Sequence, residues 1–319
     1  MRWWLGWVAA FYVVWAILTF GFGYWGHVKE NWPIAAAMAL GSYVAGSTPM
    51  GGGTVGFPVL VLLFDMPPSL GRNFGLLIQS IGMTSATIFI LCRRIPVEYG
   101  MLIRTIPSAA IGLVLGTFLV VPRVSDVAVK LIFACLWASF GVLTLLKNRE
   151  MCDFHGRPVI PPVERNLLSI AVGLFGGITA ALTGVGIDML LYTLLVLLYR
   201  MDLKIAVPTS VMIMAAASLM GTALHVAIGD LSANVYHSWL AASPVVILGA
   251  PLGAYIVTLI PRIYTLYFVA VLCVFQFFWA LWVTGPTPAQ WLFVAVNLVI
   301  AMAGFRVLYS AGKRRAARG

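Results

Sequence analysis

The sequence predicts an all-α polytopic membrane protein with two inverted repeats, about eight transmembrane crossings and two broken, re-entrant-like helix hairpins. Composition is the first of three observations behind this prediction: hydrophobic residues make up 61% of the 319 residues and charged residues only 9%, with a mean hydropathy of +0.99. Apolar runs of about 20 residues, enough for one membrane crossing, recur along the chain. A weak internal repeat relates the two halves. So few charged residues cannot cover a water-facing surface, which excludes a soluble enzyme, a disordered tail protein and a fibrous repeat.

The apolar runs follow one another from the beginning of the chain to its end. The first run is too long for the core of a signal peptide and has no clear small-x-small cleavage site, so we expect a retained first helix. Most of the later runs have the length of one crossing. In order, the runs are 3–26, 31–48, 53–66, 73–92, 99–121, 126–146, 166–183, 187–200, 204–228, 237–259, 263–284 and 287–309.

Two pairs of runs have short arms joined by glycine-rich sequence. Between 31–48 and 53–66 the joint reads Ser-Thr-Pro-Met-Gly-Gly-Gly, and between 166–183 and 187–200 it reads Thr-Gly-Val-Gly. Backbone without helical hydrogen bonds is tolerated at membrane depth only where it lines a protein cavity. We therefore expect each pair to be a helix hairpin that breaks within the membrane.

The second half of the chain repeats the first at a shift of 135 residues. Residues 60–66 (Leu-Val-Leu-Leu-Phe-Asp-Met) fall on residues 195–201 (Leu-Val-Leu-Leu-Tyr-Arg-Met). The similarities continue in the same order over about 100 residues, which indicates a duplicated chain of about four elements per half. Further matches pair Gly51 with Gly186, Gly112 with Gly249, Gly116 with Gly253, and 121–124 with 260–263.

The basic residues predict the orientation. When each broken pair is treated as a hairpin that returns to its starting side, alternate loops carry 16 and 4 of the 20 Lys and Arg residues. We expect the protein to lie in the inner membrane of the cell. Because basic residues collect in cytoplasmic loops, we expect both termini to lie in the cytoplasm. The two repeats then start on opposite sides and are inverted. Inverted repeats with broken helices are typical of secondary transporters, and the breaks mark the substrate site.

These features divide the chain into five parts. The first transmembrane helix occupies residues 1–28 and the first inverted repeat residues 29–146. A charged linker with several prolines, residues 147–165, is expected in the cytoplasm. The second inverted repeat covers residues 166–284, and residues 285–319 hold the final transmembrane helix and a basic cytoplasmic tail.

A helix that breaks inside the membrane is suited to binding an anion. Its free N–H groups and the positive end of its dipole attract sulfonate or carboxylate oxygens. Glycine allows close backbone approach and positive φ. The alternative is that the glycines only permit tight helix packing. Three adjacent glycines, residues 51–53, are poor helix formers and favour the break.

The two joints, together with Ala-Val-Pro-Thr-Ser at residues 206–210, resemble the TauE/SafE family of sulfite and organosulfonate exporters. The resemblance covers about residues 30–310. It implies a transporter of sulfite, thiosulfate, sulfoacetate or a related sulfur anion. Two segments depart from the family pattern: residues 71–75 read Gly-Arg-Asn-Phe-Gly rather than Thr-Ser, and Ile-Asp stands at 187–188 where the first half has Gly-Gly.

Two charged residues are candidates for the site. Arg72 lies at the entrance to the run 73–92 beside Asn73, and its guanidinium could fork onto a sulfonate or carboxylate. The alternative is an extracellular loop arginine. Asp188 is the only acid well inside an apolar run, where a carboxylate is costly and usually functional. It could carry a proton, gate the site or pair with Arg72 when the site is empty; the alternative is a helix N-cap.

Hydroxyl and glycine residues near the breaks complete the candidate site. For the hydroxyls, the alternative is ordinary bonding to their own helix. His225, Asp230 and His237 match no common zinc spacing, so we expect no metal site. The substrate-binding candidates are Thr48, Gly51, Gly52, Gly53, Arg72, Asn73, Thr183, Gly184, Gly186, Thr209 and Ser210, with Asp188 for proton coupling or gating.

The expected partners are a small anionic substrate and the lipid bilayer. The net charge of +10 is assigned to cytoplasmic loops and the basic tail, not to nucleic-acid binding. The four cysteines have no metal or redox spacing and are expected to pack, so no cofactor is predicted. A homodimer is left open.

A transporter for an organosulfonate such as sulfoacetate fits the pattern best, because Arg72 and two helix breaks could hold both ends of a molecule with two anionic groups. Another small anion, such as a carboxylate, is the alternative substrate. An intramembrane enzyme is the alternative class. It would need a nucleophile–base pair or a metal set, which one interior acid does not supply.

Overall fold

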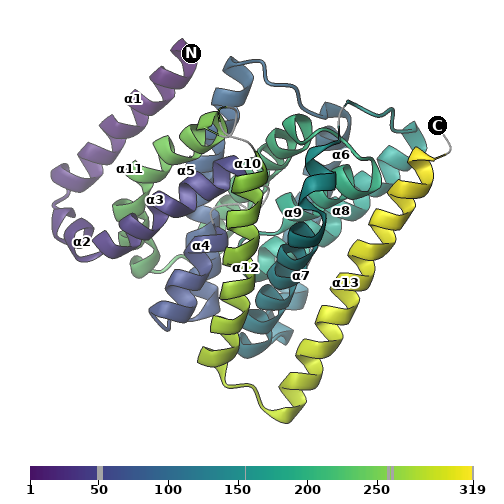
Figure 1. The fold of residues 1–319 in the computed structure, drawn as a ribbon. Helices are drawn as coiled ribbons and strands as arrows, with labels where there is room; N and C mark the ends of the chain where they lie inside the picture. The colour runs from purple at the N-terminus through teal and green to yellow at the C-terminus, as the bar shows by residue number, and fades with distance from the viewer. Residues whose placement is uncertain (49–52, 155, 257–258, 260–261, 318–319) are drawn as a thin grey trace.

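The computed structural model describes the chain except for residues 49–52, 155, 257–258, 260–261 and 318–319 (Figure 1). The protein is 86% helical, and the described residues include no strand. Within the described part, nine helical stretches are long and apolar enough to cross a membrane. The predicted class, an all-α polytopic membrane protein, is therefore confirmed.

The first half of the chain contains seven α-helices interrupted or followed by short π- and 3₁₀-helical turns, labelled η. The four π-helical turns of the described chain are η1, η2, η3 and, in the second half, η5. The elements are α1 (Arg2–Ala16), η1 (Ile17–Gly21), α2 (Trp25–Glu30), α3 (Trp32–Ser47), α4 (Gly53–Pro58), η2 (Val59–Leu63), α5 (Pro68–Cys92), α6 (Tyr99–Leu115), η3 (Gly116–Val120), η4 (Val121–Arg123) and α7 (Asp126–Cys152).

The second half contains six α-helices. Among them, α8 is 22 residues long and can itself span a membrane, so one more helix reaches spanning length than the eight expected crossings. Its partner in the first half, α3, has 16 residues. The elements are α8 (Pro162–Thr183), α9 (Ile187–Thr193), η5 (Leu194–Leu198), α10 (Leu203–Ala227), α11 (Ala233–Ile256), α12 (Arg262–Thr284) and α13 (Pro288–Ala316).

Prolines and capping side chains set where many of these helices begin. Pro68 and Pro162 occupy the first position of α5 and α8, where the missing N–H has no helical partner to lose. The Asp202 carboxylate accepts a hydrogen bond from the Lys204 amide at the start of α10. At the start of α13, the Thr287 hydroxyl and the Gln290 side chain form a reciprocal capping box.

The backbone repeats at the same 135-residue shift as the sequence. Both α5 and α10 have 25 residues, and their bounds differ by 135 at each end; the π-helical turns η2 and η5 differ by the same number. Residues with positive φ also recur at a shift of 135: Asp65 (φ 49°) matches Arg200 (φ 51°), and Arg94 (φ 53°) matches Gly229 (φ 70°). A non-glycine residue with positive φ is uncommon, so its recurrence at one shift reflects a shared local fold.

Equivalent helices of the two halves pack side by side and run antiparallel. Arg72 near the start of α5 contacts Asp230 just after α10, and Glu98 just after α5 contacts Thr209 near the start of α10. Similarly, the Asn148 side chain at the end of α7 donates to the Ile263 carbonyl at the start of α12. An inverted repeat would produce this antiparallel pairing. The orientation of each half in a membrane stays a prediction.

The halves are also interleaved, because α6 packs on α8 and α11 packs on α3. Glycines make these contacts close. A side chain at Gly112 would overlap the Leu174 carbonyl group, and one at Gly46 would overlap that of Ala250. Small residues at such crossings let helices in a membrane approach closely enough for dense packing.

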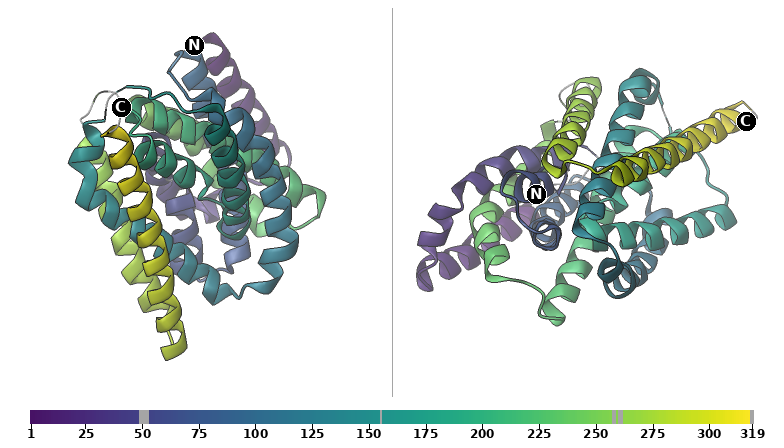
Figure 2. Two further views of the ribbon diagram at one scale, coloured as in Figure 1. Left: turned by 90° about the vertical axis from the view of Figure 1, so that its right-hand side faces the viewer. Right: turned by 90° about the horizontal axis from the view of Figure 1, so that it is seen from below.

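Burial falls from the centre of the bundle outward. In the most apolar stretch of α5, 72% of residues are buried, against 11% in α1 and in α13. These two helices lie at the periphery of the bundle, and α13, which packs on α7 and η5, is drawn in yellow (Figure 2). The start of α1 and the end of α13 lie at the same edge, opposite the turn that joins α12 to α13 (Figure 1).

Candidate substrate site

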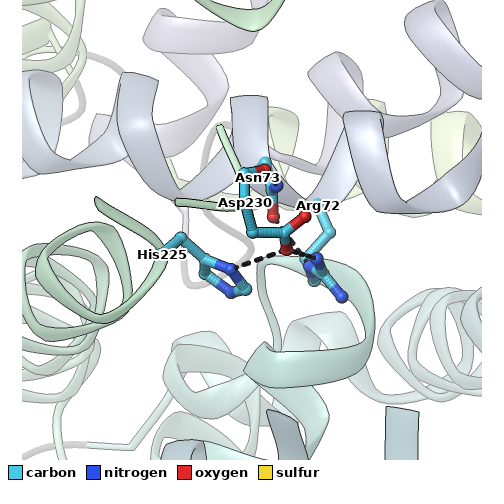
Figure 3. Close-up of polar contacts among 4 residues, drawn as sticks. All are labelled: Arg72, Asn73, His225 and Asp230. Carbon is cyan, nitrogen blue, oxygen red and sulfur yellow. Dashed lines mark hydrogen bonds and ion pairs between the residues drawn. The ribbon is translucent and has the colours of Figure 1, made fainter. Parts of the chain in front are cut away.

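A cluster of four polar residues joins the start of α5 to the end of α10 (Figure 3). The Arg72 guanidinium donates from Nη2 to Asp230 Oδ2 at 2.8 Å and from Nε to Asn73 Oδ1 at 2.8 Å. Asn73 Nδ2 in turn donates to the Asp230 carbonyl oxygen at 2.7 Å. His225 Nδ1 lies 3.0 Å from the same Asp230 Oδ2. The carboxylate of Asp230 is thus the centre of the cluster.

Burial differs sharply between the two charged partners. Arg72 is only 3% exposed, whereas the Asp230 side chain is 45% exposed on the loop between α10 and α11. A buried guanidinium needs a compensating charge, and Asp230 is its one acidic partner among the described residues. Arg72 therefore lies within α5 and is not an exposed loop arginine. Pairing with Asp188 was one of the roles considered for that acid, but in this structure the guanidinium of Arg72 pairs with Asp230.

The break between α8 and α9 lies directly against Arg72. Gly184 and Gly186 have φ of +78° and +111°, a backbone conformation that side chains rarely adopt. A Cβ atom on Gly184 would fall 2.6 Å from the Arg72 carbonyl oxygen. Gln79, two turns further along α5, donates to the Gly184 carbonyl oxygen at 3.0 Å. The glycines of this break therefore allow the chain to pass against α5 beside the buried arginine.

Asp188 is fully buried in the first turn of α9 and bends back over the break. Its Oδ1 accepts hydrogen bonds from the amides of Gly186 (3.2 Å) and Met189 (3.0 Å). Its Oδ2 has no hydrogen-bond partner among the described residues. Asp188 is not the N-cap of α9, which is Gly186, although its Oδ1 bonds two amides at the start of that helix. The second oxygen can hold a proton or meet a ligand, because a charged carboxylate oxygen without a partner is costly in a buried site.

Most of the candidate hydroxyls bond to their own helix. Thr48 donates to the Val44 carbonyl oxygen at 2.7 Å, and Ser210 donates to that of Val207 at 2.7 Å. Thr183 likewise lies within hydrogen-bond distance of the Thr179 carbonyl oxygen, at 3.0 Å. Such bonds are the ordinary behaviour of hydroxyls in membrane helices.

Thr209 does more. It donates to the Ile205 carbonyl oxygen at 2.6 Å and also accepts from the Glu98 amide at 2.9 Å. That second bond links α10 to the loop after α5.

The first predicted break, between the runs 31–48 and 53–66, is described only in part. The predicted residues Gly51 and Gly52 lie outside the described residues. Gly53 is the first residue of α4. The structure thus brings Arg72, Asn73 and Gly184 together, while Thr209 and Ser210 lie near the start of α10.

From the sequence, His225 and Asp230 were not expected to form a metal site, and His225 was expected to be an interfacial histidine. No group of three or more metal-ligating side chains occurs in the part of the chain that the structure describes. His225 is 1% exposed and belongs to the Arg72 cluster through Asp230. A buried arginine predicts an acidic partner nearby. Arg72 and Asp230 were both predicted to lie on the outer side of the membrane, and this shared location could have identified Asp230 as that partner.

This combination defines a class of protein. A polytopic helical membrane protein with a buried arginine, a loop-borne counter-charge and a glycine break beside them has the features by which membrane transporters bind anions. Comparison with family models gives the family: the model described as sulfite exporter TauE/SafE matches residues 34–278. That span is well over half of the chain, so the protein belongs to the TauE/SafE family, and the resemblance seen in the glycine-rich joints is confirmed.

Membership implies an export transporter for sulfite or a related sulfur anion, and it agrees with transport rather than catalysis. Comparisons with curated proteins and with solved structures found no match.

Proposed function

We propose that this protein is a secondary transporter that exports a small sulfur-containing anion across the inner membrane, with an organosulfonate such as sulfoacetate, or sulfite, as substrate. Arg72 is the principal binding side chain in this proposal. One observation carries it: a guanidinium that is only 3% exposed has, as its acidic partner among the described residues, a loop carboxylate that is 45% exposed. A substrate anion can take the place of that carboxylate.

The binding step is an exchange of anions on Arg72. A guanidinium offers five N–H donors, and the described contacts use Nε and Nη2. A sulfonate presents three oxygens to these donors, and its charge replaces that of Asp230 when the loop withdraws. Asn73 keeps Nε oriented throughout, since it lies next to Arg72 in α5. The break at Gly184 lies against the same turn, so its backbone contributes to the wall of the site.

Outward movement of an anion needs no coupling ion. The interior of a cell is negative, and the membrane potential favours exit of a negative charge by about 2.3 kcal/mol per 100 mV. Proton coupling remains the alternative, and the second oxygen of Asp188 supports it because that oxygen has no partner among the described residues.

A small carboxylate is the second candidate substrate, and a specific contact favours it. The group that Arg72 holds in this structure is itself a carboxylate, bound through Nη2 at 2.8 Å. Because both sulfonates and carboxylates satisfy a guanidinium, this contact supports a carboxylate substrate beside the sulfonate.

Calorimetric titration of the purified protein with sulfoacetate, sulfite, thiosulfate and acetate tests the proposal. We expect binding of at least one sulfur anion that is stronger than binding of acetate and that weakens about tenfold to a hundredfold in Arg72→Ala. Arg123→Ala is the matched control, because Arg123 is an exposed arginine on the same predicted side of the membrane. Proteoliposomes loaded with the bound anion should release it faster than empty-vector vesicles. Absence of binding to every sulfur anion would refute the proposal.

A further inference from the structure

Glu98 is a buried acid that takes no part in the proposed binding of the anion to Arg72. It precedes α6 and is 6% exposed. Its amide donates to the Thr209 hydroxyl at 2.9 Å, and its Oε2 accepts from Arg157 Nε at 2.9 Å. Arg157 belongs to the linker between the halves and is about half exposed. One acid therefore ties three parts of the chain together: the loop after α5, the start of α10 and the linker.

The loop that carries Glu98 is the equivalent of the loop that carries Asp230. The amide of Ile95 bonds to the Ile90 carbonyl oxygen and the amide of Asp230 to that of His225, each at 3.0 Å and 135 residues apart. Both loops thus leave their helices through the same turn. Each then reaches the start of the opposite helix, where Asp230 accepts from the Asn73 side chain.

The two contacts lie at opposite ends of the antiparallel pair formed by α5 and α10. Thr209 and Asp230 are separated by most of α10, which at ~1.5 Å per residue corresponds to roughly 30 Å. Each contact joins a backbone group of the loop to a side chain of the opposite helix: the Asp230 carbonyl accepts from Asn73, and the Glu98 amide donates to Thr209. Each also pairs a carboxylate with an arginine, which is Arg72 of α5 in one contact and Arg157 of the linker in the other.

We propose that these contacts are two latches that close the two ends of the substrate site and that Glu98 is the functional counterpart of Asp230. The outer latch consists of Arg72, Asn73, His225 and Asp230; the inner latch consists of Glu98, Thr209 and Arg157. Both are formed in this structure, which is therefore the form closed at both ends. In transport, one latch opens while the other holds, so that the site faces one side at a time.

The two contacts are the same whichever anion is transported. Their role in transport rests on the proposed function. Asp230 must leave Arg72 for an anion to bind there, and withdrawal of its loop opens the outer end. The corresponding withdrawal of Glu98 frees the start of α10, where Thr209 and Ser210 are buried. Glu98 therefore acts as a positioning residue.

Sided labelling of a buried cysteine tests the latches. The reporter is Ser210→Cys in a chain without its four native cysteines, with Thr183→Cys as a second reporter; both positions are at most 1% exposed. An impermeant maleimide is applied to right-side-out and inside-out vesicles. Glu98→Gln and Arg157→Gln weaken the inner latch, and Asp230→Asn weakens the outer latch. The matched controls are Arg315→Gln, which breaks a pair with Glu164, and Asp65→Asn, which breaks a pair with Lys130; the side chains of Arg315 and Asp65 are exposed.

We expect the inner-latch variants to speed labelling from one side about tenfold and Asp230→Asn to speed it from the other side by a similar factor, since hydrogen bonds to charged groups are strong enough to shift an opening equilibrium that far. The controls should change neither rate. Opposite sidedness supports the proposal whichever side proves to be cytoplasmic. Acceleration from the same side, or unchanged rates in all three latch variants, would overturn it. Because no substrate is added, failure here is distinct from a failure to bind sulfur anions.

Discussion

Replacing Arg72 separates a binding role from a structural one. In the structure its guanidinium makes two hydrogen bonds, one of them to a charged carboxylate. A substrate anion that takes over the charged bond gains a contact worth roughly 1.5–3 kcal/mol, so Arg72→Ala should weaken binding about tenfold to a hundredfold. Arg72→Lys should recover part of the loss, because lysine keeps the charge and loses the planar fork.

Asp230 should act in the opposite direction, because it competes with the substrate for Arg72. Asp230→Asn replaces a charged hydrogen bond by a neutral one, which is weaker by roughly 1 kcal/mol, so the variant should bind the anion about fivefold more tightly. In the Arg72→Ala background the same change should have little effect. The double-mutant cycle should therefore give a coupling free energy of about 1 kcal/mol between the two positions.

Isothermal titration of the wild type, both single variants and the double variant measures all four affinities. Thermal unfolding in detergent shows whether each variant is folded. Unchanged affinity in a folded Arg72→Ala variant would remove Arg72 from the site. An Asp230→Asn effect of equal size in both backgrounds would mean that Asp230 repels anions in general and does not occupy the arginine.

Three further predictions concern the packing of Gly184, the proton at Asp188 and the orientation of the chain. Gly184→Ala should lower the free energy of unfolding by about 2 kcal/mol or more, because φ is +78° and the new Cβ would lie 2.6 Å from the Arg72 carbonyl oxygen. Gly304→Ala, in a helix with open space around it, should instead be neutral or stabilising by up to ~1 kcal/mol; thermal unfolding compares the two, and equal effects would contradict the contact. Asp188→Asn should flatten the pH dependence of anion efflux from proteoliposomes, because an amide keeps the acceptor for Gly186 and Met189 but cannot take up a proton; an unchanged profile would exclude proton coupling through this residue. Val159→Cys, at a linker position that is 93% exposed, should react with an impermeant maleimide only in opened cells once the native cysteines are replaced, and labelling of intact cells would reverse the predicted orientation.

The all-α membrane fold class and the approximate positions of most helices could be predicted from the sequence, because both depend on the composition of local segments. The matching runs 60–66 and 195–201 also indicated a repeat, and the same residues form equivalent π-helical turns followed by left-handed residues. Three runs begin later than their helices: 73–92, 166–183 and 237–259 belong to helices that begin at Pro68, Pro162 and Ala233. Counting apolar residues leaves out a polar first turn, although the proline at the first two of these starts is a usual start signal.

The partners within the site depend on the tertiary fold and could be predicted only in part. Arg72 and Asn73 stood out in the sequence, but Asp230 lies 158 residues from Arg72, and no periodicity connects them. Asp188 was one candidate partner because it is the acid within an apolar run. Its carboxylate instead bonds the backbone of its own break, a local choice that sequence spacing does not predict.

In the transport cycle proposed above, the two halves exchange roles, and the backbone register that they share gives the two end states similar helices. If the halves were identical, the forms open to either side would have the same contacts and equal populations. Only positions that differ, such as the acids after α5 and α10, can then bias the resting state. Since about 1.4 kcal/mol shifts an equilibrium tenfold, one hydrogen bond in either half is enough, under that proposal, to set which side the empty transporter faces.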